Sequence, residues 1–278
     1  MTPPRSSLQI SLKAAAVLFG IWYVIGLVLM TTHWIPREVA ERARVWGDVV
    51  FLLLAASVTF LFSARLCGWG AAARISAVIL MASAVAELFG AKTGYPFGQY
   101  QYTENLGPKI LGLMPAIIPF CWLTIVLNAF WIVYYLFQRH LSDPSATLLM
   151  FIASASVAVL TDFNLEPVAS LVKLYWIWFD GGLGYEGIPG LNFFGWWMVS
   201  FVVLNVVRHL LPESFEISRP PWTSYALLAA INLLFALINF RAGFLLPVFI
   251  ALNTFGVLGI LLLLNSPENA GPQGPTPQ

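Results

Sequence analysis

Three carboxylic acids stand out because each lies in or directly after a long apolar run. Glu87 sits three residues before Gly90, near the end of a run that is otherwise almost wholly apolar. Asp162 and Glu166 are four residues apart, so on a helix they share one face about one turn apart. A carboxyl group at membrane depth costs roughly 2.5–3.5 kcal/mol on insertion scales. The acids are therefore candidates for chemistry.

Two neighbouring carboxyl groups in a low-dielectric setting are not easily both ionised, so one of them keeps its proton. A neutral carboxylic acid beside a carboxylate suits general acid and base catalysis. Two simpler interpretations remain open. Asp162 and Glu166 would lie at the membrane surface, solvated or paired with Lys173, and Glu87 would pair with Lys92 along its own helix.

The composition identifies a membrane protein. Hydrophobic residues make up 59% of the 278 positions and charged residues only 10%, with a mean hydropathy of +0.80. A soluble domain has about 25% charged residues. We therefore predict an all-α, polytopic integral membrane helical bundle, a multi-pass protein of the cell membrane with the lipid bilayer as its surroundings. A formal net charge of +1 argues against a nucleic-acid partner.

Apolar runs of about 20 residues predict about eight transmembrane helices. Seven remain an alternative, because only Arg241-Ala-Gly separates the last two. A short polar tail (residues 1–11) precedes a single transmembrane domain (residues 12–264), and a disordered tail (residues 265–278) follows it. The predicted spans are Leu12–Thr31, Trp46–Ala64, Ile75–Ala91, Leu111–Phe137, Ala146–Glu166, Phe193–Leu211, Ser224–Phe240 and Phe244–Leu264.

Two irregular, aromatic-rich regions follow the third and fifth predicted spans. The first is Glu87–Tyr102, and the second runs from Thr161 to Trp197. An even number of crossings separates them, so both emerge on the same membrane face. One site built from both regions is therefore feasible. The aromatic residues of the second region also fit an interfacial belt. A belt leaves the interleaved glycines, prolines and acids unexplained.

Several kinds of chemistry lack their motifs. The three histidines are far apart in the chain, and Cys67 and Cys121 have no Cys-x-x-Cys spacing. No glycine-rich nucleotide fingerprint or P-loop is present. We therefore predict no metal and no cofactor, which leaves acid–base catalysis on an apolar substrate or no catalysis at all.

The run Glu87-Leu-Phe-Gly-Ala-Lys-Thr-Gly-Tyr-Pro-Phe-Gly-Gln-Tyr-Gln-Tyr-Thr103 resembles the membrane carotenoid-biosynthesis family of carotenoid 1′,2′-hydratases, including bacterioruberin-pathway hydratases. Trp176-Ile-Trp178, Tyr185-Glu-Gly-Ile-Pro189 and Asn192-Phe-Phe-Gly-Trp196 are similar to the family as well. The resemblance implies a hydro-lyase that adds water to the terminal double bond of an acyclic (ψ) carotenoid end, giving a tertiary alcohol. It also implies lycopene or a related carotenoid as substrate and other carotenoid-pathway enzymes as candidate partners.

Such a reaction needs a desolvated acid to protonate the alkene, aromatic faces to stabilise the cation and a carboxylate to orient water. We expect Asp162 or Glu87 to donate the proton and Glu166 to position the water. The other candidates bind the substrate. Trp122, Trp176 and Trp196 form the wall facing the cation, Tyr95, Phe97 and Tyr100 shape the end-group pocket, and Trp178, Tyr185 and Asn192 complete the set.

Three rival functions remain. A cofactor-free membrane lycopene cyclase needs the same protonation, but a second alkene captures the cation and the product mass does not change. A non-catalytic carotenoid-binding membrane protein would tolerate amide substitutions at Glu87 and Asp162. Intramembrane acids also suit a proton-coupled transporter, although no inverted repeat is visible.

Overall fold

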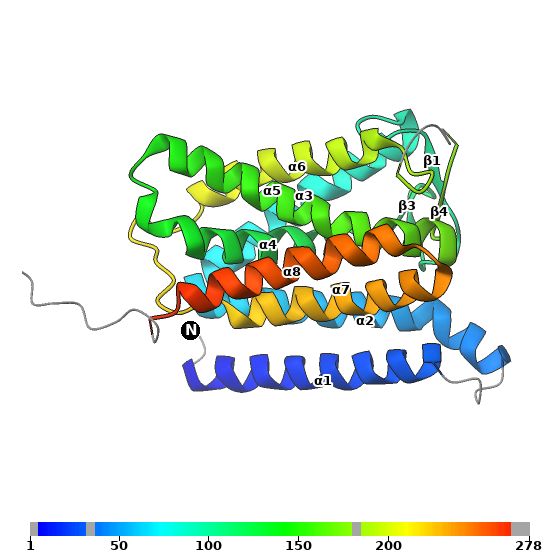
Figure 1. Cartoon of the computed structure of the whole chain (residues 1–278), viewed down its shortest axis with the longest axis horizontal. Coiled ribbons are helices and arrows are strands. Elements are labelled where there is room, and N and C mark those ends of the chain that lie inside the picture. The colour runs from blue at the N-terminus through cyan, green and yellow to red at the C-terminus, as the bar shows by residue number, and fades with distance from the viewer. Residues whose placement is uncertain (1–4, 32–36, 180–184, 268–278) are drawn as a thin grey trace, which may run out of the picture.

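The computed structural model describes residues 5–31, 37–179 and 185–267, and these form a helical bundle (Figure 1). Only the first three residues of the predicted C-terminal tail fall inside these ranges. The helices are α1 (Arg5–Thr31), α2 (Arg37–Cys67), α3 (Trp69–Thr93), α4 (Ile118–Phe137), α5 (Pro144–Glu166), α6 (Gly190–His209), α7 (Trp222–Ala242) and α8 (Leu245–Leu264). The short elements are β1 (Tyr100–Tyr102), β2 (Lys109–Ile110), β3 (Met114–Pro115), β4 (Trp176–Trp178), the 3₁₀ turn η1 (Gln138–His140) and the π-helical segment η2 (Pro167–Val172).

Within the described ranges, eight helices are long and apolar enough to cross a membrane. The prediction of an all-α, polytopic membrane bundle is therefore confirmed. The last two predicted spans are separate helices, because the chain turns at Gly243. This residue has a φ of 89°, a conformation that glycine adopts without steric cost.

Helix α4 is the centre of the bundle and α1 is its outermost member. Almost every side chain from Ile118 to Tyr135 is buried, as expected for a helix that is apolar all round. Helix α1 lies along one edge and packs chiefly on α2 (Figure 1). The indole Nε1 of Trp22 donates to the carbonyl oxygen of Gly47 at 2.9 Å, which ties these two helices together.

The fourth span begins later than predicted. We expected it to start at Leu111, but α4 begins at Ile118. Residues Leu111 and Gly112 have φ values of 52° and 70°. Such angles interrupt a right-handed helix, and the chain here forms the turn between β2 and β3 instead.

The two irregular regions meet at one end of the bundle, where β1 pairs with β4 in antiparallel register (Figure 1). Tyr100 lies opposite Trp178, and Tyr102 lies opposite Trp176. The prediction that both regions emerge on the same face is confirmed. The α-helical part of α5 ends at Glu166, the predicted end of the fifth span, and the chain continues through the π-helical η2 towards β4.

Candidate active site

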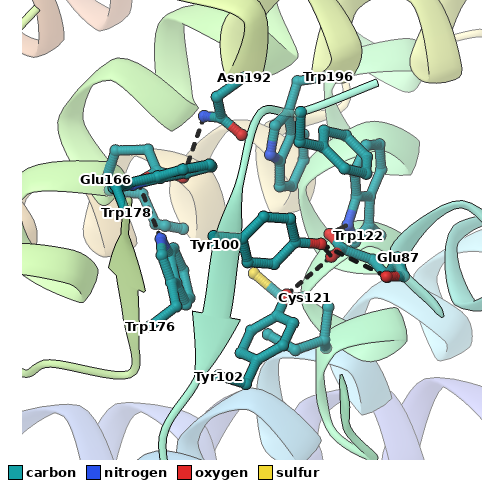
Figure 2. A pocket seen from close by; sticks show the side chains of 13 residues that line it. Glu87, Tyr100, Tyr102, Cys121, Trp122, Glu166, Trp176, Trp178, Asn192 and Trp196 are labelled. Atoms are coloured by element: carbon teal, nitrogen blue, oxygen red, sulfur yellow. Dashed lines mark hydrogen bonds between the residues drawn. The ribbon is translucent and has the colours of Figure 1, made fainter. Parts of the chain in front are cut away.

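Glu87 is buried near the end of α3 and accepts three hydrogen bonds (Figure 2). The hydroxyls of Tyr100 and Tyr102 donate to its Oε2 at 2.7 and 2.8 Å. The indole Nε1 of Trp122 donates to its Oε1 at 2.9 Å. Tyr100 and Tyr102 point to the same side because alternate residues of a strand share a face. Hydrogen-bond donors of the protein thus surround the Glu87 carboxyl group. The simpler interpretation, in which Glu87 pairs with Lys92, is wrong.

Both tyrosines hold their protons firmly. Burial, followed by the charge of the neighbouring Glu87, raises the pKa of Tyr100 and of Tyr102 above the ordinary tyrosine value. The hydroxyl groups therefore remain able to donate to Glu87 over the whole physiological pH range. A tyrosine hydroxyl can also accept a hydrogen bond, which the indole of Trp122 cannot do.

Glu166 is held in the same manner by the second region. The indole Nε1 atoms of Trp176 and Trp178 both donate to its Oε2 at 3.2 Å. These indoles are two residues apart on β4, so they reach the same carboxyl from one strand face. The side-chain Nδ2 of Asn192 donates to Oε1 of Glu166 at 3.0 Å. Every described partner of the Glu166 carboxyl group is therefore a nitrogen that can only donate.

Asp162 is connected to this site through Asn192. The Nδ2 atom of Asn192 also donates to Oδ2 of Asp162 at 3.0 Å, so one amide group links both acids of α5. Asp162 is wholly buried, and its Oδ1 has no hydrogen-bond partner among the described residues. Lys173 pairs with Asp48 at 2.5 Å, not with Asp162 or Glu166. The surface interpretation of the acid pair is therefore wrong.

Most of the predicted site residues line one small cavity of ≈ 30 Å³ between the two regions. A space of this size holds about one water molecule. The predicted residues along its wall are Glu87, Phe97, Tyr100, Trp122, Glu166, Trp176, Trp178, Asn192 and Trp196. In the described part of the chain, neither glutamate on this wall forms an ion pair.

Three predicted residues lie outside the wall. Asp162 contacts Asn192 but does not line the cavity. The side chain of Tyr95 is 67% exposed. The Tyr185 hydroxyl donates to the carbonyl oxygen of Phe163 at 3.1 Å, a hydrogen bond that links Tyr185 to α5.

Four wall residues were not predicted: Tyr102, Ile118, Cys121 and Leu165. Tyr102 had a detectable signal, because it stands two residues after Tyr100 and shares its face if that run is a strand. The other three carry no signal, since apolar residues are common along every span.

Phe97 closes the cavity at the junction of α3 and α6. A Cβ atom added at Gly90 or at Gly195 would come within 2.6 Å of its ring. Since real Cβ atoms do not approach so closely, the ring fits only because both helices carry glycine there. The ring also meets Trp122 at a centroid distance of 6.1 Å.

The described residues offer no metal site, since no three His, Cys, Asp or Glu side chains come together among them. The geometry instead provides two carboxyl groups on one small, aromatic-walled cavity. Such an arrangement can deliver a proton from one group and accept a proton at the other.

Comparisons with known proteins identify the family of this chain. The sequence profile described as "Carotenoid biosynthesis protein" matches residues 47–258. A protein from Haloarcula japonica named bisanhydrobacterioruberin hydratase is 33% identical over 110 residues. That alignment covers 40% of this chain and 36% of the archaeal protein, so the chain matches about a third of the length of this relative. No solved structure gives a significant match.

Proposed function

The chain belongs to the carotenoid biosynthesis protein family, and on that premise we propose that it hydrates the terminal double bond of an acyclic carotenoid end group. The observation that carries this proposal is the pair of glutamates on one small cavity, each held by protein donors and without an ion pair among the described residues. The name of the archaeal relative supports hydration as the reaction. Lycopene or a related ψ-end carotenoid is the proposed substrate.

The hydrogen-bond partners divide the two glutamates by role. All three donors to Glu166 are indole or amide N–H groups, which cannot accept a proton from it. Glu166 is therefore suited to act as a carboxylate. The Oε2 atom of Glu87 faces hydroxyl groups, which can either donate or accept. A proton on Oε2 of Glu87 can therefore be donated to a tyrosine oxygen. Of the two glutamates on the cavity wall, Glu87 is thus the one suited to carry a proton.

In the proposed reaction, Glu87 gives its proton to the less substituted carbon of the terminal alkene. The electron pair of the double bond forms the new C–H bond and leaves a tertiary carbocation. A water molecule in the cavity bonds to this cation, and Glu166 takes the proton that the water loses. The enzyme returns to its starting state when that proton passes back to Glu87, so the net change is the addition of one water molecule.

The aromatic wall suits the charge that develops. The indole ring of Trp122 stacks on that of Trp196, and both line the cavity. An aromatic face attracts a desolvated cation by about 2 kcal/mol. The carboxylate of Glu166 adds a negative charge on the same cavity. Asn192 is assigned to hold Glu166 in place through its amide nitrogen (Figure 2). The same nitrogen also donates to Asp162.

The test is expression of the protein in a host that accumulates lycopene, followed by mass analysis of the pigments. Hydration raises the product mass by one water, and growth in ¹⁸O-water should place the label in the new alcohol. Glu87→Gln should abolish this product. Glu104→Gln is the matched control, because the Glu104 side chain is 85% exposed and lies outside the cavity wall. A product of unchanged mass would indicate a cyclase instead, and unaltered pigment in every strain would indicate a carotenoid-binding protein.

A further inference from the structure

A second, much larger cavity adjoins the small one. It has a volume of ≈ 900 Å³ and lies between α1, α2, α7 and η2. Small-molecule sites usually occupy about 300–1,000 Å³ and have mostly apolar walls with a few polar groups. This cavity fits that description. Aliphatic and aromatic side chains form most of its wall, and Asp48, Lys173 and Arg241 are its charged members.

The two cavities share part of their walls. Ile118, Cys121, Leu165 and Trp176 line both of them. The small cavity alone has room for about one water molecule and not for a carotenoid. If one end of a carotenoid lies near Glu87 and Glu166, the rest of the molecule must lie outside the small cavity. The adjoining larger cavity has the space for it.

We propose that this larger cavity binds the polyene chain of the substrate and holds its terminal alkene at the shared wall, next to the small cavity that holds the water. The inference rests on the proposed function, because it takes a carotenoid as the substrate. Its occupant is a long, apolar, methyl-branched polyene that arrives from the lipid. Helix α1 packs chiefly on α2, so the outer wall of the cavity at α1 is a single helix thick (Figure 1).

At two glycines on the wall, a larger side chain can be introduced to fill the cavity without a clash. Gly26 of α1 and Gly47 of α2 both line it, and a Cβ atom added at either position would meet no heavy atom within 4 Å. A phenylalanine at either position therefore has open space to occupy. Gly20, also on α1, has the same open surroundings but does not line the cavity. Gly20→Phe is thus the matched control.

The first measurement is binding, and it does not depend on turnover. Wild type and the three variants are purified from a host that makes acyclic carotenoids, and bound pigment per protein is read from visible absorbance. Gly26→Phe and Gly47→Phe should each lower bound pigment by about tenfold or more, whereas Gly20→Phe should retain it. Equal pigment in all four proteins overturns the proposal, as does a wild-type protein that carries phospholipid and no carotenoid.

The second measurement compares a full-length carotenoid with a short alkene that has the same trisubstituted end. Filling the larger cavity should lower kcat/KM for the long substrate and leave the value for the short one unchanged. Equal losses for both substrates would contradict the assignment. If wild type binds carotenoid without hydrating it, the proposed function fails while the binding measurement still decides the role of the cavity. If hydration occurs and filling changes nothing, the function stands and the cavity assignment fails.

Discussion

Trp122 and Trp196 stack face to face, with ring centroids 3.6 Å apart and ring planes 3° apart. Trp122 lies in the first turns of α4, and Trp196 lies near the start of α6. The stack joins these two helices beside the small cavity. It also fixes the indole of Trp122, whose Nε1 donates to Glu87, so the acid and the aromatic wall are positioned together.

Replacing Trp196 should reduce turnover more than it reduces substrate binding. Trp196→Leu removes an aromatic face from the cavity wall, and a loss of about 2 kcal/mol of cation stabilisation corresponds to roughly a 30-fold fall in kcat. Trp196→Phe keeps an aromatic face and should retain more activity. Trp197→Phe is the control, because Trp197 stacks on Phe201 and does not line the cavity. A rise in KM with kcat unchanged would contradict a role in stabilising the cation.

Glu87 and Asp162 should differ in their contribution to the rate. Glu87→Gln should lower kcat by about 10²–10⁴-fold, the usual contribution of a general acid. Asp162→Asn should cause a smaller loss, because Asp162 contacts the site only through Asn192 and does not line the cavity. Initial rates of hydrated product from purified variants measure this order. The reverse order would make Asp162 the proton donor.

Gly195→Ala should abolish activity while the protein still folds. The added Cβ atom would approach the ring of Phe97 to 2.6 Å and the carbonyl oxygen of Pro96 to 2.8 Å. Phe97 must then shift, and it lines the ≈ 30 Å³ cavity, which has little room to spare. Gly256→Ala is the control, since Gly256 also lies inside a helix and its Cβ atom would meet nothing within 4 Å. Size-exclusion profiles in detergent check folding, and product formation checks activity.

The stability of the protein should fall as the pH rises above about 10, the ordinary pKa of tyrosine. Burial and Glu87 raise the pKa of Tyr102 in the folded protein. Above pH 10 the unfolded chain loses this proton while the folded protein keeps it, so the unfolding free energy decreases with pH. The slope is about 1.4 kcal/mol per pH unit for each such tyrosine.

Tyr102→Phe should therefore show a shallower decline than the parent protein between about pH 10 and 12. Thermal unfolding midpoints, measured across this range, give the comparison. Trp122→Phe is the matched control, because it also removes one donor to Glu87 but has no titrating hydroxyl. If the Tyr102→Phe slope equals that of the parent protein, the hydroxyl of Tyr102 does not titrate as its burial implies.

The sequence predicted much of the fold because the bilayer constrains it strongly. Apolar length located the spans, and counting crossings placed Glu87 and Glu166 at one end of the bundle, where β1 now pairs with β4. The start of α4 was missed because the turn at Leu111 depends on backbone angles that hydropathy does not encode. The α-helical part of α5 ends at Glu166, the predicted end of the fifth span, but Glu166 keeps helical angles (φ −55°, ψ −50°) and the chain continues as the π-helical η2.

The partners of the acids could not be predicted in the same way. Lys92 and Lys173 are near the acids in sequence and were the natural candidates, yet Glu87 is held by Tyr100, Tyr102 and Trp122. Trp122 lies 35 residues beyond Glu87. Contacts across such separations depend on how helices pack, and spacing along the chain says little about them. Tyr102 was not predicted either, although its alternation with Tyr100 along the chain was a detectable signal.

The ≈ 30 Å³ cavity also bears on the purity of the product. A tertiary carbocation in open solution partitions among several fates: capture by any nearby nucleophile, loss of a proton to a shifted alkene, or attack by a neighbouring double bond. Enclosure suppresses such side reactions. With space for about one water molecule, the cavity would present the cation of the proposed reaction with a single nucleophile at a single position. The tightness of this chamber, as much as the strength of its acid, would decide that the outcome is one alcohol rather than a mixture.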